Sequence, residues 1–150
     1  MISKGYVTGK LDLDERWSSY IKEKDWESLD KLCYQQLAKD GQLHQALQKI
    51  KSFNETEHIL SLRQSPDDEG IWHDDGSRFM AFSVSLNLNP ETIEGGELEM
   101  RKKENKEEVY TLSNLPFGHY YIFATSQDNW EHRTQAVKSG ERLVFAGWCS

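Results

Sequence analysis

Three residues have the types and spacing of a metal site. His73 and Asp75 lie two positions apart in the segment 72–76, and such residues of a β-strand point the same way, so an imidazole and a carboxylate can face one point in space. A second histidine, His132, arrives several β-type runs later. Two imidazoles and one carboxylate on one face of an ion leave neighbouring coordination positions open, an arrangement that suits Fe(II) reacting with dioxygen. We therefore predict that these three residues bind a metal ion.

Arg142 strengthens this prediction, because a His-x-Asp pair by itself arises by chance in many proteins. It follows His132 by ten residues, at the start of an apolar run. A guanidinium that enters a β interior needs an anionic partner to offset its desolvation, and its fork matches a carboxylate. The dicarboxylate 2-oxoglutarate would chelate the ion with its keto-acid end and reach Arg142 with the other carboxylate. The simpler alternative is an arginine that pairs with a surface glutamate.

The elements that must position these residues fall into two parts. Residues 14–53 are charged and rich in helix formers, with apolar residues at helical spacing, which predicts amphipathic helices that support the core. A turn signal at Lys39-Asp40-Gly41 predicts a break into two helices, with Asp40 as the N-cap of the second.

Residues 58–148 consist of short β-type runs separated by turn residues, which predicts an antiparallel jelly roll or barrel. The charged run 101–108 is typical of a solvated hairpin tip. We expect strands near residues 58–63, 80–88, 97–101, 109–112, 120–124, 134–137 and 142–148.

The clearest strand pattern lies in residues 79–88, where large apolar and small or polar side chains alternate. The polar face either borders solvent or lines a pocket inside a barrel. The apolar face consists of Met80, Phe82, Val84, Leu86 and Leu88, and the other face of Ala81, Ser83, Ser85 and Asn87.

Length and charge set the broad class. We expect residues 1–150 to form one domain, since domains cluster near this size. The net charge of −7 makes nucleic acid and anionic membranes poor partners. Cys33 and Cys149 are too few to staple a domain and lack zinc-site spacing, which favours a reducing compartment. The N-terminus lacks the apolar core of a signal peptide and no run is long enough to span a membrane, so we expect a cytoplasmic protein.

Several short motifs follow one another between residues 60 and 148. They occupy residues 62–66, 72–76, 88–90 and 94–98, the last containing Gly-Gly-Glu-Leu. A closing series consists of His132, Val137, Gly140, Arg142 and Trp148. In order and spacing these motifs resemble the Fe(II)/2-oxoglutarate-dependent oxygenases of the prolyl-hydroxylase-like type.

The resemblance implies a mainly β fold with N-terminal helices around a double-stranded β-helix, or jelly roll. It also implies hydroxylation with dioxygen as co-substrate, releasing succinate and CO2. Fe(II) would be bound by His73, Asp75 and His132, and 2-oxoglutarate by Arg142.

The resemblance, together with strand alternation and closeness to His132, points to four further residues. Asn87 falls where relatives often help to bind the distal carboxylate of 2-oxoglutarate, and Ser85 shares its face. An amide can donate a hydrogen bond there, although a solvent-facing asparagine fits the sequence as well. Gln64 stands where relatives often carry an aromatic residue, and Trp130 lies close to His132. We expect Gln64 at the substrate pocket; Trp130 is a candidate for the wall of the same pocket, with core packing as the favoured role of that residue.

Two other classes remain open at this point. One is a cupin-like metal-binding β-barrel enzyme that does not use 2-oxoglutarate, and the other is a binding module that keeps the fold without turnover. Arg142 separates the first from an oxygenase, because a cupin-like enzyme needs no carboxylate anchor. A fold alone does not choose a substrate. We expect a protein side chain or a small metabolite, because the acidic charge disfavours nucleic acid and the short chain leaves few elements to shape a pocket. The sequence gives no oligomeric state.

Overall fold

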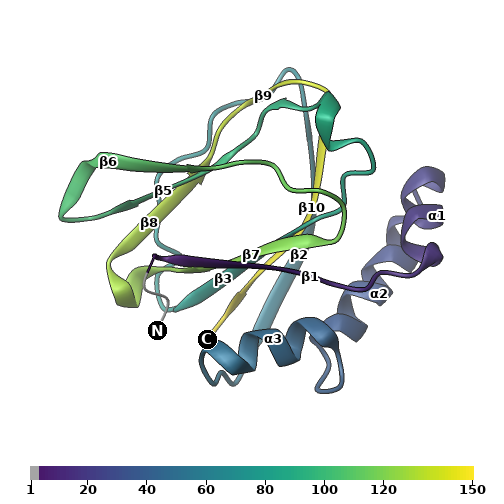
Figure 1. The fold of residues 1–150 in the computed structure, drawn as a ribbon, viewed down its shortest axis with the longest axis horizontal. Helices are drawn as coiled ribbons and strands as arrows, with labels where there is room; N and C mark the ends of the chain where they lie inside the picture. Colours follow the sequence, from purple (N-terminus) through teal and green to yellow (C-terminus); the bar gives the residue numbers. More distant parts are fainter. Residues whose placement is uncertain (1–3) are drawn as a thin grey trace.

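The computed structural model describes residues 4–150, which form a β core with helices on one side. Figure 1 shows the arrangement. In chain order the elements are β1 (Tyr6–Lys10), α1 (Glu15–Glu23), α2 (Trp26–Leu37), α3 (Gln42–Ile50), β2 (Thr56–Gln64), β3 (Met80–Ser85), the 3-10 turn η1 (Pro90–Thr92), β4 (Glu94–Gly95), β5 (Leu98–Lys102), β6 (Asn105–Leu112), β7 (His119–Ala124), the 3-10 turn η2 (Ser126–Asp128), β8 (Trp130–Thr134), β9 (Val137–Ser139) and β10 (Glu141–Cys149).

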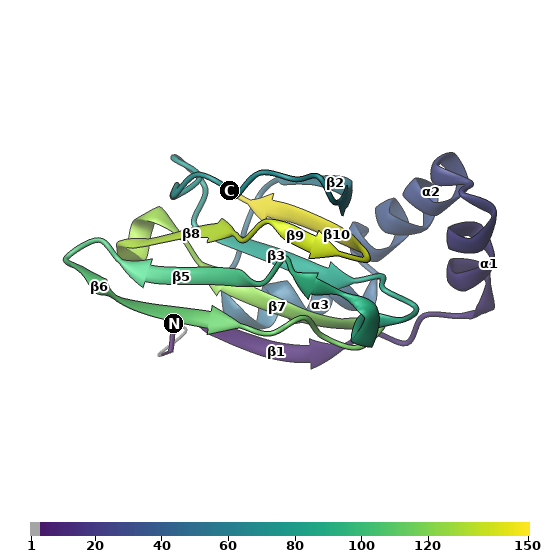
Figure 2. The ribbon, with the colours of Figure 1, turned by 90° about the horizontal axis from the view of Figure 1, so that it is seen from above.

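The strands form one large sheet and two smaller ones. The large sheet has the order β1-β7-β3-β10-β2, and the smaller sheets have the orders β6-β5-β8 and β4-β9. All neighbouring strands are antiparallel. The three-stranded sheet packs across from the large one (Figure 2). The predicted fold class, mainly β with N-terminal helices and a jelly-roll core, is confirmed.

Two apolar cores hold these layers together. The first lies between the helices and the large sheet and includes Trp17, Leu29 and Phe145. The second lies between the sheets and includes Met100 and Phe123. Phe145 is fully buried, and removing a phenyl group from such a site typically costs about 3–5 kcal/mol.

Strand alternation decides which side chains reach the space between the sheets. On β10, Phe145 packs in the helix-side core, whereas Arg142 and Val144 line a cavity on the opposite face. On β3, Phe82 and Val84 face the helix side, and Ser83 faces the cavity. The polar face predicted for residues 79–88 therefore lines a cavity and does not border solvent.

The helical part differs from the prediction in its breaks. It contains three helices, because the chain also turns at Lys24, which adopts a left-handed φ of 56°, and Asp25 caps α2 by accepting a hydrogen bond from Ser28 N at 3.2 Å. The prediction of Asp40 as an N-cap was wrong. Gly41 is the N-cap residue and makes no side-chain cap bond. Leu43 N, in the first turn of α3, instead donates a hydrogen bond to Gln36 Oε1.

The strands differ in two places. β1 was not predicted, because its five residues include Gly9, a weak strand former; there the glycine leaves room for the Tyr120 hydroxyl, which would lie 2.2 Å from an added Cβ. The strand predicted at residues 134–137 spans the break between β8 and β9. The charged run 101–108 does form the β5-β6 hairpin, and its tip is exposed.

The two cysteines, Cys33 and Cys149, are buried free thiols. Burial raises the pKa of Cys33 and raises that of Cys149 to about 12, so both remain protonated and poorly reactive at neutral pH. Among the described helices, none combines the length and the apolar character needed to cross a membrane.

Candidate metal centre

The three predicted ligands meet at one point. One ligand atom from each of His73, Asp75 and His132 lies within 4.8 Å of the others. His73 Nε2 is 3.3 Å from Asp75 Oδ1, and His132 Nε2 is 3.2 Å from Asp75 Oδ2. The carboxylate thus presents one oxygen to each imidazole, and an ion can be held among the three.

The two histidines are brought together by the backbone. His132 lies on β8, and the chain at His73 runs antiparallel to it in an isolated bridge, with His73 N donating to His132 O at 3.0 Å and His132 N donating to His73 O at 2.8 Å. The ring centroids are 4.3 Å apart. Residues directly opposite in an antiparallel pair project to the same face, so both imidazoles enter the cavity from one side.

Asp75 reaches the site in a way that the sequence reasoning missed. The strand-alternation argument for His73 and Asp75 was wrong: Asp75 has a left-handed φ of 64°, and Gly76 follows with 61°. A turn, not strand alternation, brings the carboxylate back towards the histidines. A positive φ is costly for a non-glycine residue unless its surroundings enforce it.

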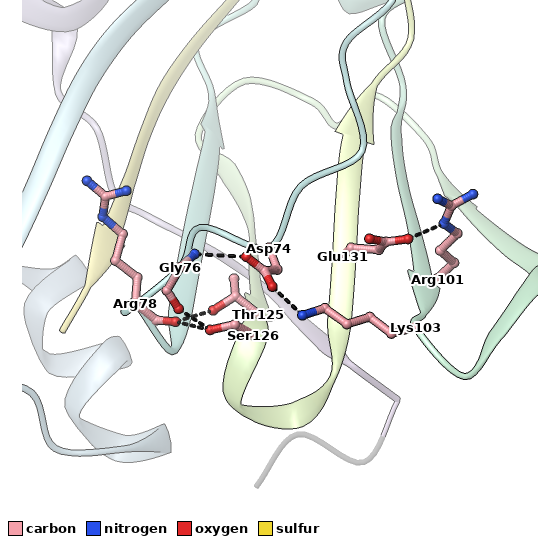
Figure 3. A network of polar contacts seen from close by, with 8 residues as sticks. All are labelled: Asp74, Gly76, Arg78, Arg101, Lys103, Thr125, Ser126 and Glu131. Carbon is pink, nitrogen blue, oxygen red and sulfur yellow. Dashed lines mark hydrogen bonds and ion pairs between the residues drawn. The ribbon is translucent and has the colours of Figure 1, made fainter.

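Those surroundings appear in Figure 3. The Asp74 carboxylate accepts a hydrogen bond from Gly76 N at 2.9 Å and pairs with Lys103 Nζ. The Ser126 hydroxyl donates to Gly76 O, which fixes the far end of the turn. Side chains from the β5-β6 hairpin and from η2 therefore hold the loop that carries Asp75.

Electrostatics favour a cation at the centre. Burial alone would raise the pKa of Asp75, but the contacts of His132 and His73 outweigh it and hold the carboxyl well below its usual range. His73 Nδ1 donates to Ile71 O at 2.7 Å, which leaves the lone pair on Nε2, facing the site. Asp75 Oδ2 is buried without a hydrogen-bond partner among the described residues. A divalent cation fits this donor set, since it would satisfy that oxygen and bind both Nε2 atoms.

At the other end of the cavity lies Arg142, on the cavity face of β10. It is 7% exposed, and its Nε has no hydrogen-bond partner in the described chain. Burial and the neighbouring positive charge of Arg63 lower the pKa of Arg142 to about 10, although the negative charge of Asp67 acts in the opposite direction. The guanidinium therefore remains charged at neutral pH. Gly96 leaves room for its stem, because an added Cβ would lie 2.8 Å from Arg142 Cδ. A buried cation of this kind is an anion site.

A cavity of about 150 Å³ joins the two ends, with His73 and His132 at one side and Arg142 at the other. Its walls are largely apolar and include Phe123, Val144 and Trp148. The dimensions and the charges suit a small diacid that touches both a metal ion and an arginine.

Ser85 and Asn87 lie on the far side of Arg142, in a small adjoining pocket. Asn87 Nδ2 donates to Ser85 Oγ at 3.0 Å, and Leu143 N donates to Asn87 Oδ1 at 2.7 Å. Both residues are buried, so Asn87 does not face solvent. Its carbonyl is used by the backbone, which leaves one amide hydrogen and the Ser85 hydroxyl available to an anion beside Arg142.

The structure does not place Gln64 or Trp130 on the cavity wall. Gln64 is exposed at the end of β2, and Trp130 packs in the core between the sheets. Tyr121 was missed by sequence reasoning: it is buried beside Arg142 in the same small pocket as Ser85, with its hydroxyl donating to Ser113 O at 2.7 Å. The alternation of β7, where Phe123 also faces inward, could have indicated it.

The sequence profile of the 2OG-Fe(II) oxygenase superfamily matches residues 60–150. The chain belongs to this superfamily. The match covers more than half of the chain and includes His73, Asp75, His132 and Arg142. Fe(II) and 2-oxoglutarate are the metal and co-substrate that the family and the His-Asp-His arrangement imply.

Relatives agree with this assignment. A PKHD-type hydroxylase from Hyphomonas neptunium is 38% identical over 69 residues, which are 46% of this chain and 27% of that protein. The match thus spans about a quarter of the relative's length. A prolyl-4-hydroxylase from Pseudomonas putida is similar in structure, with a TM-score of 0.67 at 19% identity over 97% of this chain and 87% of that one. A viral collagen prolyl hydroxylase from Paramecium Bursaria Chlorella virus-1 gives 0.61 at 14% identity, over 96% and 88% of the two chains. These likenesses show that the fold is shared.

Proposed function

We propose that this protein is an Fe(II)- and 2-oxoglutarate-dependent dioxygenase that hydroxylates a protein side chain or a small metabolite. One observation carries the proposal: a single cavity connects a His-Asp-His cluster to a buried arginine whose Nε has no hydrogen-bond partner in the described chain. The reaction combines a substrate C–H bond, 2-oxoglutarate and dioxygen, and yields the hydroxylated product, succinate and CO2. The name of the Hyphomonas relative, a hydroxylase, supports this reaction class.

In this proposal His73, Asp75 and His132 would hold Fe(II). Fe(II) would supply the redox chemistry that activates dioxygen. Arg142 binds the distal carboxylate of 2-oxoglutarate through its guanidinium fork. Ser85 and Asn87 add hydrogen bonds from the adjoining pocket.

The remaining wall residues fix the His132 imidazole and exclude water, and they leave one side of the cavity open to a substrate. Phe123 packs edge-to-face on His132, with ring centroids 4.8 Å apart, and fixes this imidazole in the cavity. Val144 and Trp148 give the cavity apolar walls, which strengthen the attraction between Arg142 and an anion by excluding water. The His73 side chain is half exposed, so the metal end opens outward and is the side from which a substrate would approach.

Arg142 also argues against a cupin-like enzyme that does not use 2-oxoglutarate. Such an enzyme would have no need of a buried cation at the far end of the metal cavity, and an unpartnered buried charge is destabilising. The net charge of −7 disfavours nucleic acid as substrate. A cytoplasmic location stays a prediction.

Succinate release under air tests the proposal. The protein is supplied with Fe(II) and 2-oxoglutarate and screened against metabolites and peptides, including prolyl peptides, with His73→Ala as the matched control. We expect at least one compound to raise succinate release above the uncoupled rate, and His73→Ala to abolish the increase. Equal succinate from wild type and His73→Ala across the screen would contradict the proposal.

A further inference from the structure

The outer face of the metal-bearing sheet carries an ordered set of charges. Because β5 and β8 are antiparallel, Glu99 lies opposite Arg133, and Arg101 opposite Glu131. Arg133 Nε donates to Glu99 Oε1 at 2.9 Å, and Arg101 Nε donates to Glu131 Oε1 at 2.6 Å. The second of these pairs is drawn in Figure 3. Each guanidinium is therefore held in place by a carboxylate on the neighbouring strand.

Trp72 lies against this charged surface. The guanidinium carbon of Arg101 is 3.9 Å from the centroid of the indole ring, and that of Arg133 is 4.7 Å away. Both distances are within the range of cation–π attraction, for which tryptophan is the best partner. The indole thus rests on two cations that the sheet itself orients.

The stack of Trp72 on Arg101 and Arg133 lies on the opposite face of the sheet from the metal site. The bridge that turns His73 and His132 into the cavity turns their chain neighbours outward, and these neighbours are Trp72, Asp74, Glu131 and Arg133. His73 is the most exposed ligand, with 50% of its side chain exposed against 7% for His132. Its segment belongs to no strand of the sheets, so the outer contacts of Trp72 are well placed to fix its backbone.

We propose that Trp72 is a positioning residue for His73, and that its stack on Arg101 and Arg133 sets the metal affinity of the site. The inference rests on the proposed metal site but adds residues that never touch the ion. Residues that orient metal ligands from behind are typically worth 10–100-fold in affinity. A planar guanidinium is required, because lysine keeps the charge and loses the stacking surface.

Titration with Co(II) alone tests the inference, with the visible absorption of the bound ion as readout. We expect Trp72→Leu to weaken Co(II) binding by roughly 10-fold and to change the shape of the absorption band, because His73 is no longer held in one orientation. Trp72→Phe, which restores an aromatic face, should recover most of the affinity. Tyr110→Leu is the matched control: it removes a half-exposed aromatic residue from the same sheet and should leave binding unchanged.

Thermal unfolding of the metal-free variants separates positioning from general destabilisation. If Trp72→Leu does not fold, Arg101→Lys with Arg133→Lys replaces it, and these variants should show the same weakening at unchanged melting temperature. Wild-type protein that fails to bind Co(II) would contradict the proposed metal site. Wild-type protein that binds, with Trp72→Leu binding equally well and giving the same spectrum, would overturn the role of Trp72 alone.

Discussion

The two ends of the cavity are built differently. At the metal end, Asp75 lies in a turn with a left-handed φ, and His73 is joined to β8 by an isolated bridge. At the other end, Arg142 lies within β10, which pairs with β2 along its whole length, and is almost fully buried. The metal end is thus a loop fixed by side chains, whereas the arginine end is part of the sheet.

This difference predicts how each end responds to change. A loop held by side chains can be loosened from outside without unfolding the protein, because its contacts lie near the surface. A strand in a sheet keeps its register, since a slip of one residue would turn Arg142 out of the cavity. Substitutions around the metal should therefore alter metal affinity. Substitutions around Arg142 should alter either 2-oxoglutarate affinity or the free energy of unfolding, depending on which interaction they remove.

The largest effect is expected for Asp75→Ala, which removes the carboxylate that faces both imidazoles. Metal affinity should fall by more than roughly 100-fold, because even residues behind the ligands are worth 10–100-fold. Titration with Co(II) measures the loss. The comparison is Asp74→Ala, which loosens the turn at Gly76 and Lys103 but removes no ligand and should therefore weaken binding much less; if Asp74→Ala weakened binding as much as Asp75→Ala, the assignment of ligands would be wrong.

Arg142→Met should come next, and it should separate the two ends. We expect 2-oxoglutarate affinity to fall by roughly 100-fold, as when one partner of a buried charge pair is removed, while metal affinity stays the same. Stability should be unchanged or rise by about 1 kcal/mol, because an unpartnered buried charge is lost. Calorimetry with each ligand and chemical denaturation check these outcomes. Tight 2-oxoglutarate binding by Arg142→Met would show that the carboxylate is held elsewhere.

Asn87→Leu should act mainly on stability. It leaves Leu143 N without its buried acceptor, which should cost about 2 kcal/mol of unfolding free energy. Ser85→Ala removes the acceptor of the Asn87 side-chain amide and of a longer bond, 3.4 Å, from Asn87 N, and should cost about 1 kcal/mol, with a moderate loss of 2-oxoglutarate affinity. Equal destabilisation by the two substitutions, measured in urea, would mean that the bond to Leu143 N is not the important one.

The smallest effect concerns Asp67, which ties the loop after β2 to β9. Val137 N donates to Asp67 Oδ2 at 3.1 Å, and this bond, with nearby Arg63, lowers the pKa of Asp67. A lowered folded-state pKa means stabilisation that is present above the unfolded value near 4 and is lost as the pH falls through the folded one. Asp67→Asn should cost about 1 kcal/mol at pH 6, and the difference from wild type should shrink below pH 4. Exposed Asp68→Asn is the control and should show no such trend.

The sequence predicted the fold class and the meeting of His73, Asp75 and His132 because motif spacing and strand alternation carry that information. The same alternation predicted the cavity face of β3, with Ser85 and Asn87 on it. Alternation could not show how the Asp75 carboxylate reaches the two histidines, because the turn that carries it depends on Lys103 and Ser126, which are distant in sequence.

Other failures have similar causes. β1 depends on pairing with β7 more than on its own composition. Trp130 shares the inward face of β8 with His132 and packs in the core between the sheets, the role that the sequence favoured over the pocket wall. Gln64 was judged from the position of its counterpart in relatives, yet it falls at the exposed end of β2.

The most direct test of the central claim is an anaerobic titration of the Fe(II)-loaded protein with 2-oxoglutarate, followed by the visible absorption that appears when the keto acid chelates Fe(II). The account predicts a saturable band for wild type, no band for Asp75→Ala, and a band that needs roughly 100-fold more 2-oxoglutarate for Arg142→Met. A wild-type protein that binds Fe(II) but gives no band at any 2-oxoglutarate concentration would contradict it.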